Sequence, residues 1–271
     1  MNTMKVGIVG CGNIATDLCL AVQKGDIPAR IAALSDIDTA RAEALRDAHA
    51  PEAVVCDLDA NAASVDFIVE CAAADAVETV VDAAIRHRKD CLLLSVGGLL
   101  ACPELVARAR EHHVNVRVPA GALCGLDGIR AAREGGLESV TLTTRKPPRG
   151  LEGAPYLVER GIDLSGIEEP KVVFEGSPLD ACKAFPKNIN VAAALSHFGI
   201  GPHKTRVCVI ADPAAQTNSH EVRAEGAFGV LTARTENLPS PRNPKSSYLA
   251  SLSAVAELRV AAESFEASQK E

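Results

Sequence analysis

Two periodicities alternate along the first 118 residues of the chain. Short apolar or β-branched runs recur at "KVGIVG", "RIAALSD", "AVVCD", "VDFIVECA", "CLLLSVG" and "VNVRVPA". Alanine-rich amphipathic stretches lie between them, at 13–24, 38–48, 75–88 and 103–113. Strands that alternate with helices favour parallel pairing through right-handed crossovers. The pattern therefore predicts an α/β domain with a doubly wound parallel (Rossmann) sheet over residues 1–120.

The pattern changes after Gly121. Residues 124–135 have the periodicity of one more helix, and the runs that follow alternate apolar with polar residues. These runs are "LESVTLTTRK", "KVVFEG", "TRVCVIAD", "SHEVRAEGAF" and "GVLTARTEN". They predict a second α+β domain with a mostly antiparallel sheet over residues 121–238. Residues 239–271 are expected to end in a helix of about 20 residues that packs back on the first domain.

Composition excludes several classes of function. The chain has 271 residues, a net charge of −7, 3% aromatic residues and no tryptophan. An acidic chain without stacking residues is a poor nucleic-acid binder. No apolar run is long enough to span a membrane, and the first residues lead directly into a strand, which predicts neither a membrane anchor nor a signal peptide. Nine cysteines without metal-ligand spacing predict no metal site and a cytoplasmic location.

A glycine-rich turn joins the first strand to the first helix. Gly10, Gly12 and Ala15 match the spacing G-x-G-x-x-G/A, and the helix then begins at Asn13 and Ile14. The first glycine permits a tight turn, the second lets the backbone approach a pyrophosphate, and the third small residue lets the helix pack on the strand. We therefore expect Gly10, Gly12, Asn13 and Ile14 to bind a dinucleotide. The alternative is a structural turn that binds nothing.

An acidic residue closes the second predicted strand. Asp36, in "ALSD", stands where a carboxylate would accept hydrogen bonds from the adenosine ribose. Asp38 adds negative charge that disfavours a 2′-phosphate, so NAD is expected as the cofactor. Arg41, one helical turn further on, keeps NADP possible. The alternative role for Asp36 is that of a helix N-cap.

Small residues end three of the later strands. They occur in "ECAA" (70–73), "SVGGL" (95–99) and "PAGAL" (119–123). Ligands of open α/β sheets bind at the carboxyl ends of the strands. Three such ends at one sheet edge favour a cleft for the nicotinamide over ordinary turns.

Motifs in the second half carry a resemblance to a known family. The segments "PAGALCGLDGIRAA", "TLTTRKPP", "AFPKNINVAAALS", "DPAAQTNSHEVRAEGAFG" and "ENLPSPRNPKSSYLASLS" together resemble the L-aspartate dehydrogenase family. The resemblance implies oxidation of L-aspartate by NAD(P) to iminoaspartate, which hydrolyses to oxaloacetate and ammonia or feeds NAD biosynthesis. It also implies that His220 is the catalytic residue and that Ala122 and Asn190 contact the nicotinamide.

The substrate that this resemblance implies is a dianion with an ammonium group. Its carboxylates need cationic or N–H partners. The second half offers seven candidate cations, of which Lys187 and Lys245 stand inside the resemblance motifs beside Asn188 and Pro244. The seven are Arg145, Lys146, Lys183, Lys187, Lys204, Arg206 and Lys245. Most of the seven are expected to be solvated surface charges.

His220 and the asparagines also have ordinary structural interpretations. His220 starts an alternating run after the polar turn "QTNS", where a histidine can be a simple edge residue. A proton shuttle near neutral pH nevertheless suits imidazole, and we expect His220 to deprotonate the amine or to activate the attacking water. Asn188 and Asn190 open an apolar helical run, so one of them is expected to cap that helix.

Two other functions remain open from the residues. One is a related two-domain dehydrogenase for another small amino acid, similar to homoserine dehydrogenase or dihydrodipicolinate reductase. The other is a non-catalytic NAD-binding homologue. A half-covered sheet in the second domain would expose an apolar face, so a homodimer through that sheet is expected.

Overall fold

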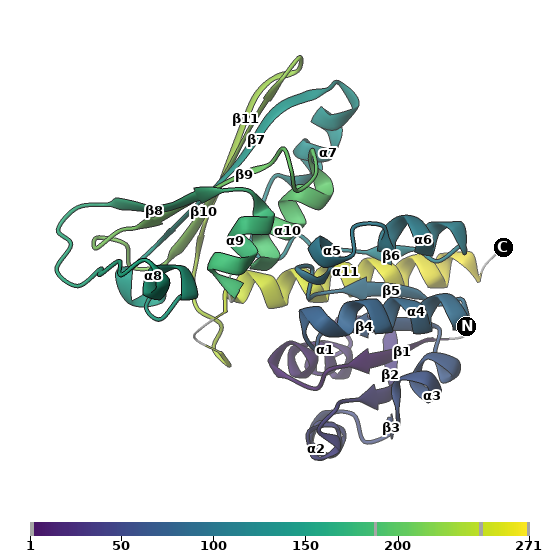
Figure 1. Cartoon of the computed structure of the whole chain (residues 1–271). Helices are drawn as coiled ribbons and strands as arrows, with labels where there is room; N and C mark the ends of the chain where they lie inside the picture. The colour runs from purple at the N-terminus through teal and green to yellow at the C-terminus, as the bar shows by residue number, and fades with distance from the viewer. Residues whose placement is uncertain (1–2, 187–188, 244–245, 270–271) are drawn as a thin grey trace. The chain divides into compact units, whose positions relative to one another are not determined.

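The computed structural model describes residues 3–186, 189–243 and 246–269 of the chain. Contacts between residues divide the chain into two compact units. The first unit comprises residues 1–119 and 251–271, and the second comprises residues 120–250. Figure 1 labels the helices and strands of both.

The first unit is built on a six-stranded sheet in the order β3-β2-β1-β4-β5-β6. Every neighbouring pair is parallel, as the alternating pattern predicts. Each of the six apolar runs of the sequence overlaps one strand. The strands are β1 (Met4–Val9), β2 (Ala29–Ser35), β3 (Val54–Val55), β4 (Phe67–Glu70), β5 (Asp90–Leu93) and β6 (Val116–Arg117). The expected doubly wound parallel sheet is therefore confirmed.

The helices of the first unit alternate with its strands. They are α1 (Asn13–Gln23), α2 (Thr39–His49), α3 (Leu58–Ser64), α4 (Val77–His87), α5 (Gly98–Ala101) and α6 (Leu105–Glu111), with a 3-10 turn η1 (Ala74–Ala76). The helix α11 (Tyr248–Ser268) follows the last strand of the chain, and its residues from Ser251 onward belong to the first unit. The sequence pattern does not predict α3. Asp57, the last residue of the run "AVVCD", begins that helix instead, because its side chain accepts the Ala60 N–H at 2.8 Å.

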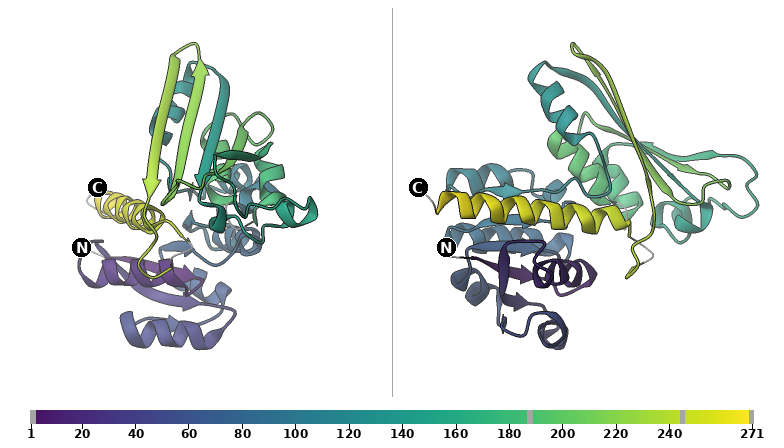
Figure 2. Two further views of the ribbon diagram at one scale, coloured as in Figure 1. Left: turned by 90° about the vertical axis from the view of Figure 1, so that its left-hand side faces the viewer. Right: turned by 180° about the vertical axis from the view of Figure 1, so that it is seen from behind.

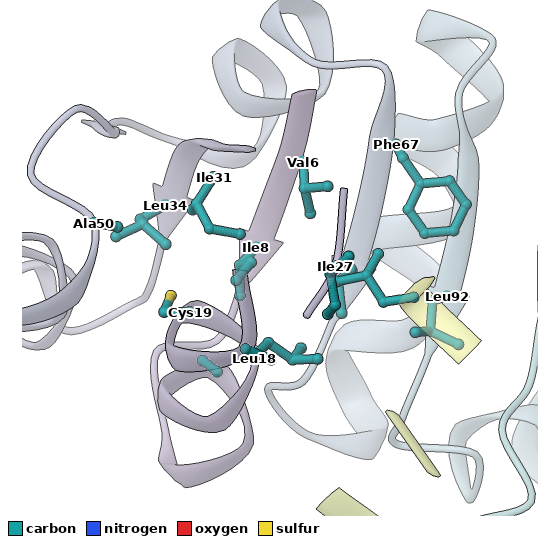
Figure 3. Packing of buried hydrophobic residues seen from close by; sticks show 14 of the residues in the cluster. Val6, Ile8, Leu18, Cys19, Ile27, Ile31, Leu34, Ala50, Phe67 and Leu92 are labelled. Atoms are coloured by element: carbon teal, nitrogen blue, oxygen red, sulfur yellow. The ribbon is translucent and has the colours of Figure 1, made fainter. Parts of the chain in front are cut away.

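One hydrophobic cluster joins β1, α1, α2 and α11. Ile8 on β1 and Leu18 and Cys19 on α1 are buried in it, and Figure 3 shows their side chains together. The residues that α11 buries there or close by recur every three or four positions, which is one stripe of a helix. They are Ser251, Ala254, Leu258, Ala261 and Ala262. The first unit therefore uses the end of the chain as part of its core.

The second unit contains a five-stranded sheet in the order β11-β10-β7-β9-β8. Its strands are β7 (Leu137–Lys146), β8 (Lys171–Gly176), β9 (Arg206–Ala211), β10 (Asn218–Gly226) and β11 (Gly229–Asn237). β7 and β9 are parallel and the other three pairs are antiparallel. Figure 2 shows β7, β10 and β11 as long strands side by side. The prediction of a mostly antiparallel second sheet is confirmed.

Helices cover one face of this sheet. They are α7 (Leu126–Glu134), α8 (Pro155–Glu159), α9 (Pro178–Ala184) and α10 (Ile189–Phe198), and a 3-10 turn η2 (Pro148–Gly150) follows β7. On β7, Val140, Leu142, Thr144 and Lys146 are buried, whereas the residues between them are partly exposed. The burial alternates because successive side chains of a strand point to opposite faces of the sheet. The last two buried residues of β7 are polar, which marks the end of the hydrophobic core.

The opposite face of β7, β10 and β11 is polar. Most of its residues are polar, namely Ser139, Thr141, Thr143, Arg145, Ser219, Glu221, Arg223, Glu225, Thr232, Arg234 and Glu236, and Val230 on β11 is an exposed apolar residue among them. Arg223 pairs with Glu225 at 2.6 Å, and Arg234 pairs with Glu236 at 2.8 Å. The sequence predicts an apolar face here, whereas the open face of these three strands is mainly polar, with Val230 as an exposed apolar residue. Across the described residues, no helix has both the length and the apolar character that a membrane crossing needs.

Candidate active site

The glycine turn between β1 and α1 leaves room at its second glycine. Gly10 has φ +92, and a Cβ there would lie 2.5 Å from the Cα of Ala72. Only glycine fits this position. Gly12 is the N-cap of α1, and no atom lies within 4 Å of where its Cβ would be. The first N–H groups of α1 are thus open to a ligand, as a pyrophosphate site requires. Asn13 is exposed and Ile14 is half-buried.

Asp36 follows β2 and braces the same turn. Its Oδ2 accepts the Cys11 N–H at 2.7 Å, and its Oδ1 accepts the Asp38 N–H at 2.9 Å. The N-cap of α2 is Asp38, so the alternative role of Asp36 as the N-cap is wrong. A carboxylate has about four acceptor positions, which leaves Asp36 able to accept from ribose hydroxyls as well. The structure therefore brings Gly10, Gly12, Asn13 and Asp36 together.

Glu70 is a buried acid that the sequence analysis does not identify. It is the last residue of β4 and is 0% exposed. Its Oε1 accepts the Ala72 N–H at 2.8 Å, and its Oε2 accepts the Ser95 N–H at 2.9 Å. Burial raises the pKa of Glu70, and these N–H groups oppose that shift. Glu70 thus joins the loops after β4 and β5, at the sheet edge where the small-residue segments occur.

His220 lies on the helix-covered face of the second sheet. It stands opposite Thr144 across the β7–β10 pair, and its Nδ1 is 3.0 Å from the Thr144 Oγ1. Both side chains are buried. Burial, and then the positive charge of Lys146, lowers the pKa of His220 to about 3. The imidazole is therefore neutral at physiological pH.

Lys146 is the last residue of β7 and shares this face with Thr144 and His220. It is only 6% exposed, and burial lowers its pKa to about 8. It lines a cavity of about 570 Å³ in the second unit. The polar residues around that cavity are Lys146, Arg149, Glu152, Gln216, Thr217, Asn218 and Asn237. A cavity of this size suits a small ligand with several hydrogen-bonding groups.

The carbonyl oxygen of Ala122 is hydrogen-bonded to residues of the second sheet near His220. That oxygen accepts hydrogen bonds from Thr235 Oγ1 at 2.9 Å and from Asn237 Nδ2 at 3.1 Å. Thr235 stands opposite His220 across the β10–β11 pair. Ala122 is buried as a whole residue. Asn190 stands on another element, in the first turn of α10, with an exposed side chain.

The other candidate cations differ from Lys146. Arg145 forms an ion pair with Asp212 at 2.8 Å and lies on the opposite face of the sheet. Lys183, Lys204 and Arg206 are exposed. Lys187 and Lys245, with their neighbours Asn188 and Pro244, lie outside the described residues. Among the residues that the structure describes, no group of histidine, cysteine, aspartate or glutamate side chains could hold a metal ion.

Two family models each match one half of the chain, and a relative of known activity matches both halves together. Residues 10–119 match the family model described as "Homoserine dehydrogenase, NAD binding domain". Residues 127–261 match the model described as "Aspartate dehydrogenase, C-terminal". The L-aspartate dehydrogenase of Methanosarcina mazei is 44% identical over 260 residues, which are 94% of this chain and 96% of that protein. The chain belongs to the L-aspartate dehydrogenase family.

More distant members of the L-aspartate dehydrogenase family match over nearly the same length. The L-aspartate dehydrogenase of Bradyrhizobium diazoefficiens is 38% identical over 256 residues, or 94% of this chain and 91% of that protein. The crystal structure of aspartate dehydrogenase from Thermotoga maritima superposes with a TM-score of 0.72 at 27% identity. The superposition covers 95% of this chain and 96% of the Thermotoga maritima chain. The family resemblance drawn from the second-half motifs is confirmed.

Proposed function

We propose that the chain is an NAD-dependent L-aspartate dehydrogenase that oxidises the Cα–N bond of L-aspartate. The product, iminoaspartate, hydrolyses to oxaloacetate and ammonia. The single observation that carries this proposal beyond family membership is the cluster on the second sheet. There a buried neutral imidazole, His220, is hydrogen-bonded to Thr144 beside the buried cation Lys146. An acidic amino acid needs a base and a cation of this kind.

The glycine turn fits a dinucleotide. Open space at Gly12, the free N-terminus of α1 and the carboxylate of Asp36 offer N–H donors for phosphates and an acceptor for a ribose. NAD, when bound, accepts the hydride that leaves Cα. The residues expected to hold it are Gly10, Gly12, Asn13, Ile14 and Asp36, together with Ala122 and Asn190.

His220 is proposed to accept a proton at Nε2. Its Nδ1 is engaged with Thr144, so when Nδ1–H donates to Oγ1 the lone pair of Nε2 faces away from that bond. A base whose pKa is about 3 is weak in the free protein. A dianionic substrate changes this, because its negative charges offset Lys146 and raise the pKa of His220. The imidazole can then take the proton of the substrate ammonium. Once it has released that proton to solvent, it can take a second one from the water that attacks the imine.

Asp36 is proposed to make NAD the preferred cofactor. A 2′-phosphate would approach two carboxylates, Asp36 and Asp38, whose negative charges repel it. Arg41 is paired with Asp38 at 3.3 Å, so part of its charge is already offset by that carboxylate. We expect NADH to bind at least tenfold more tightly than NADPH, and D36S to reduce this ratio. Equal affinities in the unmodified protein would contradict the role of Asp36.

A substrate panel tests the proposed function. The purified protein is assayed for reduced cofactor with L-aspartate, D-aspartate, L-glutamate and L-homoserine, each with NAD and with NADP. The proposal expects turnover with L-aspartate and NAD. Preference for L-homoserine would favour the related dehydrogenase suggested by the first half of the chain. NADH binding without turnover of any substrate would indicate a non-catalytic homologue.

We also propose that the protein works as a homodimer in the cytoplasm. All nine cysteines are free, which suits a reducing compartment. The open face of the second sheet carries arginine and glutamate side chains in alternation, and such a surface can pair with a second copy through opposite charges. Light scattering at micromolar concentration tests this, and a monomer would overturn it.

A further inference from the structure

We propose that Lys146 binds a carboxylate of the substrate within the cavity bordered by the ends of β7 and β10. The inference rests on the proposed function and names the group that recognises the acidic amino acid. Neither the family models nor the sequence motifs select Lys146 from the other candidate cations. The structure selects it by its position.

The first observation is the sheet register. Thr144 and His220 face each other across β7 and β10, and the paired register ends with Arg145 opposite Ser219. Lys146 and Asn218 are the next residues at these ends of the two strands. Side chains two residues apart on one strand point to the same face. His220 and Lys146 are thus diagonal neighbours on one face, and the charge of Lys146 lowers the pKa of His220. Lys146 and Asn218 line the cavity, and His220 stands two residues further along β10 from Asn218. We expect a substrate whose amine meets the imidazole to bring a carboxylate to the lysine.

The second observation is the burial of this lysine at a cavity wall. Lysine is rarely buried to 6% exposure, because removing its charge from water is costly. Burial lowers the pKa of Lys146 to about 8, so the ammonium still predominates at neutral pH. A charged group held in this way gains more from an incoming anion than an exposed lysine does. The cavity of about 570 Å³ gives such an anion access to it.

The third observation is the polarity of the cavity lining. Two cations, Lys146 and Arg149, line it, against one acid, Glu152. Asn218 and Asn237 add amide groups, while Leu151 and Phe185 supply apolar wall. Amide N–H donors and a lysine ammonium complement a carboxylate oxygen. The lining therefore favours a small carboxylic acid over a cation or a large apolar molecule.

The test compares K146M, K146R and a control, K171M, which removes an exposed lysine at the start of β8. Succinate, a dicarboxylate without the amine, is titrated by calorimetry into each protein saturated with NADH. We expect K146M to weaken succinate binding about 10- to 100-fold, K146R to weaken it less, and K171M to leave it unchanged. The affinity for NADH and the melting temperature check that K146M is folded.

Substrate kinetics then identify which carboxylate is bound. If the side-chain carboxylate is held, K146M raises the KM for L-aspartate and leaves any slow turnover of L-asparagine unchanged. If the main-chain carboxylate is held, K146M impairs the reactions of L-aspartate and of L-asparagine by the same factor. Succinate affinity and KM for L-aspartate that are unchanged in K146M would overturn the proposal, as would a wild-type protein that binds no dicarboxylate. Succinate binding that depends on Lys146 without any aspartate turnover would instead overturn the proposed function alone.

Discussion

The Oγ1 of Thr144 lies 3.0 Å from the Nδ1 of His220, and both side chains are buried on one face of the second sheet. The two residues are direct cross-strand partners, so the sheet itself sets the position of the imidazole. A hydrogen bond at Nδ1 holds the orientation of the ring, and in the tautomer in which Nδ1–H donates to Oγ1, Nε2 is the nitrogen that can accept a proton. Thr144 is therefore a positioning residue for His220.

Replacing Thr144 tests this relationship. T144V keeps the shape of the side chain but removes its hydroxyl, so the imidazole loses the bond that holds it. We expect kcat to fall about 10- to 100-fold, while the affinity for NADH is retained. T144S restores the hydroxyl and should recover most of kcat. The pH profile of kcat should shift in T144V and not in T144S. A T144V enzyme with the wild-type pH profile and kcat would contradict the positioning role.

The buried imidazole also predicts a pH dependence of stability. The folded-state pKa of His220 is about 3, below the ordinary value of 6.5. Between these values the unfolded chain binds a proton that the folded chain does not, so the free energy of unfolding falls as the pH falls from about 6.5 towards 3. Relative to H220Q, the wild-type protein should lose about 2 kcal/mol between about pH 7.5 and pH 5. Urea unfolding at both pH values measures it, and equal losses in the two proteins would argue against a buried neutral imidazole.

Much of the fold follows from local patterns in the sequence. The apolar runs of the first half become strands because parallel strands are buried on both faces and need continuous apolar residues. The glycine turn is visible because Gly10 must adopt a positive φ. The run "LESVTLTTRK" predicts β7 over the same residues that the structure assigns to it, because its alternate residues are buried. These features depend on neighbours in sequence.

The remaining features depend on neighbours in space. Glu70 appears in the sequence only as an acid at the end of a strand, and its role needs the Ser95 N–H from the next strand's loop. Lys146 is one of seven candidate cations in the sequence, and only the register of β7 against β10 places it beside His220. The helix α3 was missed because its start depends on a cap by Asp57 rather than on a hydrophobic period. The assignment of Asn190 to the nicotinamide stays a prediction.

The two glycines of the cofactor turn should respond differently to alanine. G12A adds a methyl group where no protein atom lies within 4 Å, so we expect a stability loss of no more than about 1 kcal/mol. The same methyl group should obstruct a pyrophosphate and raise the Kd for NADH at least about tenfold. G10A places its Cβ against the backbone of Ala72 and should destabilise the protein itself. Fluorescence titration with NADH and thermal unfolding separate the two effects, and unchanged NADH affinity in G12A would contradict a cofactor at this turn.

The buried ammonium of Lys146 predicts that the free energy of unfolding and the KM for L-aspartate change with pH above about pH 8. Its folded-state pKa of about 8 lies below the ordinary value of 10.5, so the unfolded chain binds the extra proton between these values. The free energy of unfolding should therefore rise by about 3 kcal/mol from about pH 8 to pH 10.5, and K146M should lack this rise. Over the same range the wild-type KM for L-aspartate should increase as the ammonium deprotonates. The other titratable side chains nearby are His220, Arg149 and Glu152. A KM that stays constant above about pH 8 in the wild type would contradict a charged Lys146 at the substrate.

The hydrogen bonds of Glu70 to the loops after β4 and β5 predict that replacing this buried acid affects both stability and NADH binding. E70Q replaces one carboxylate oxygen with an NH₂ group, which cannot accept the N–H of Ala72 or Ser95 that it then faces. We expect a loss of about 1 to 3 kcal/mol in the free energy of unfolding and weaker binding of NADH. D59N, at an exposed acid on α3, serves as the control and should leave NADH binding unchanged. NADH affinity that is identical in E70Q and the wild type would limit Glu70 to a role in stability.

The most direct measurement follows the hydrogen on Cα of the substrate. L-Aspartate deuterated at Cα is incubated with the protein and NAD, and the reduced nucleotide is analysed by mass spectrometry, alongside H220Q as the comparison. The account predicts one deuterium per reduced nucleotide, formed by the wild-type protein and almost none by H220Q, although H220Q still binds NADH. Reduced nucleotide without deuterium, or equal amounts from both proteins, would contradict it.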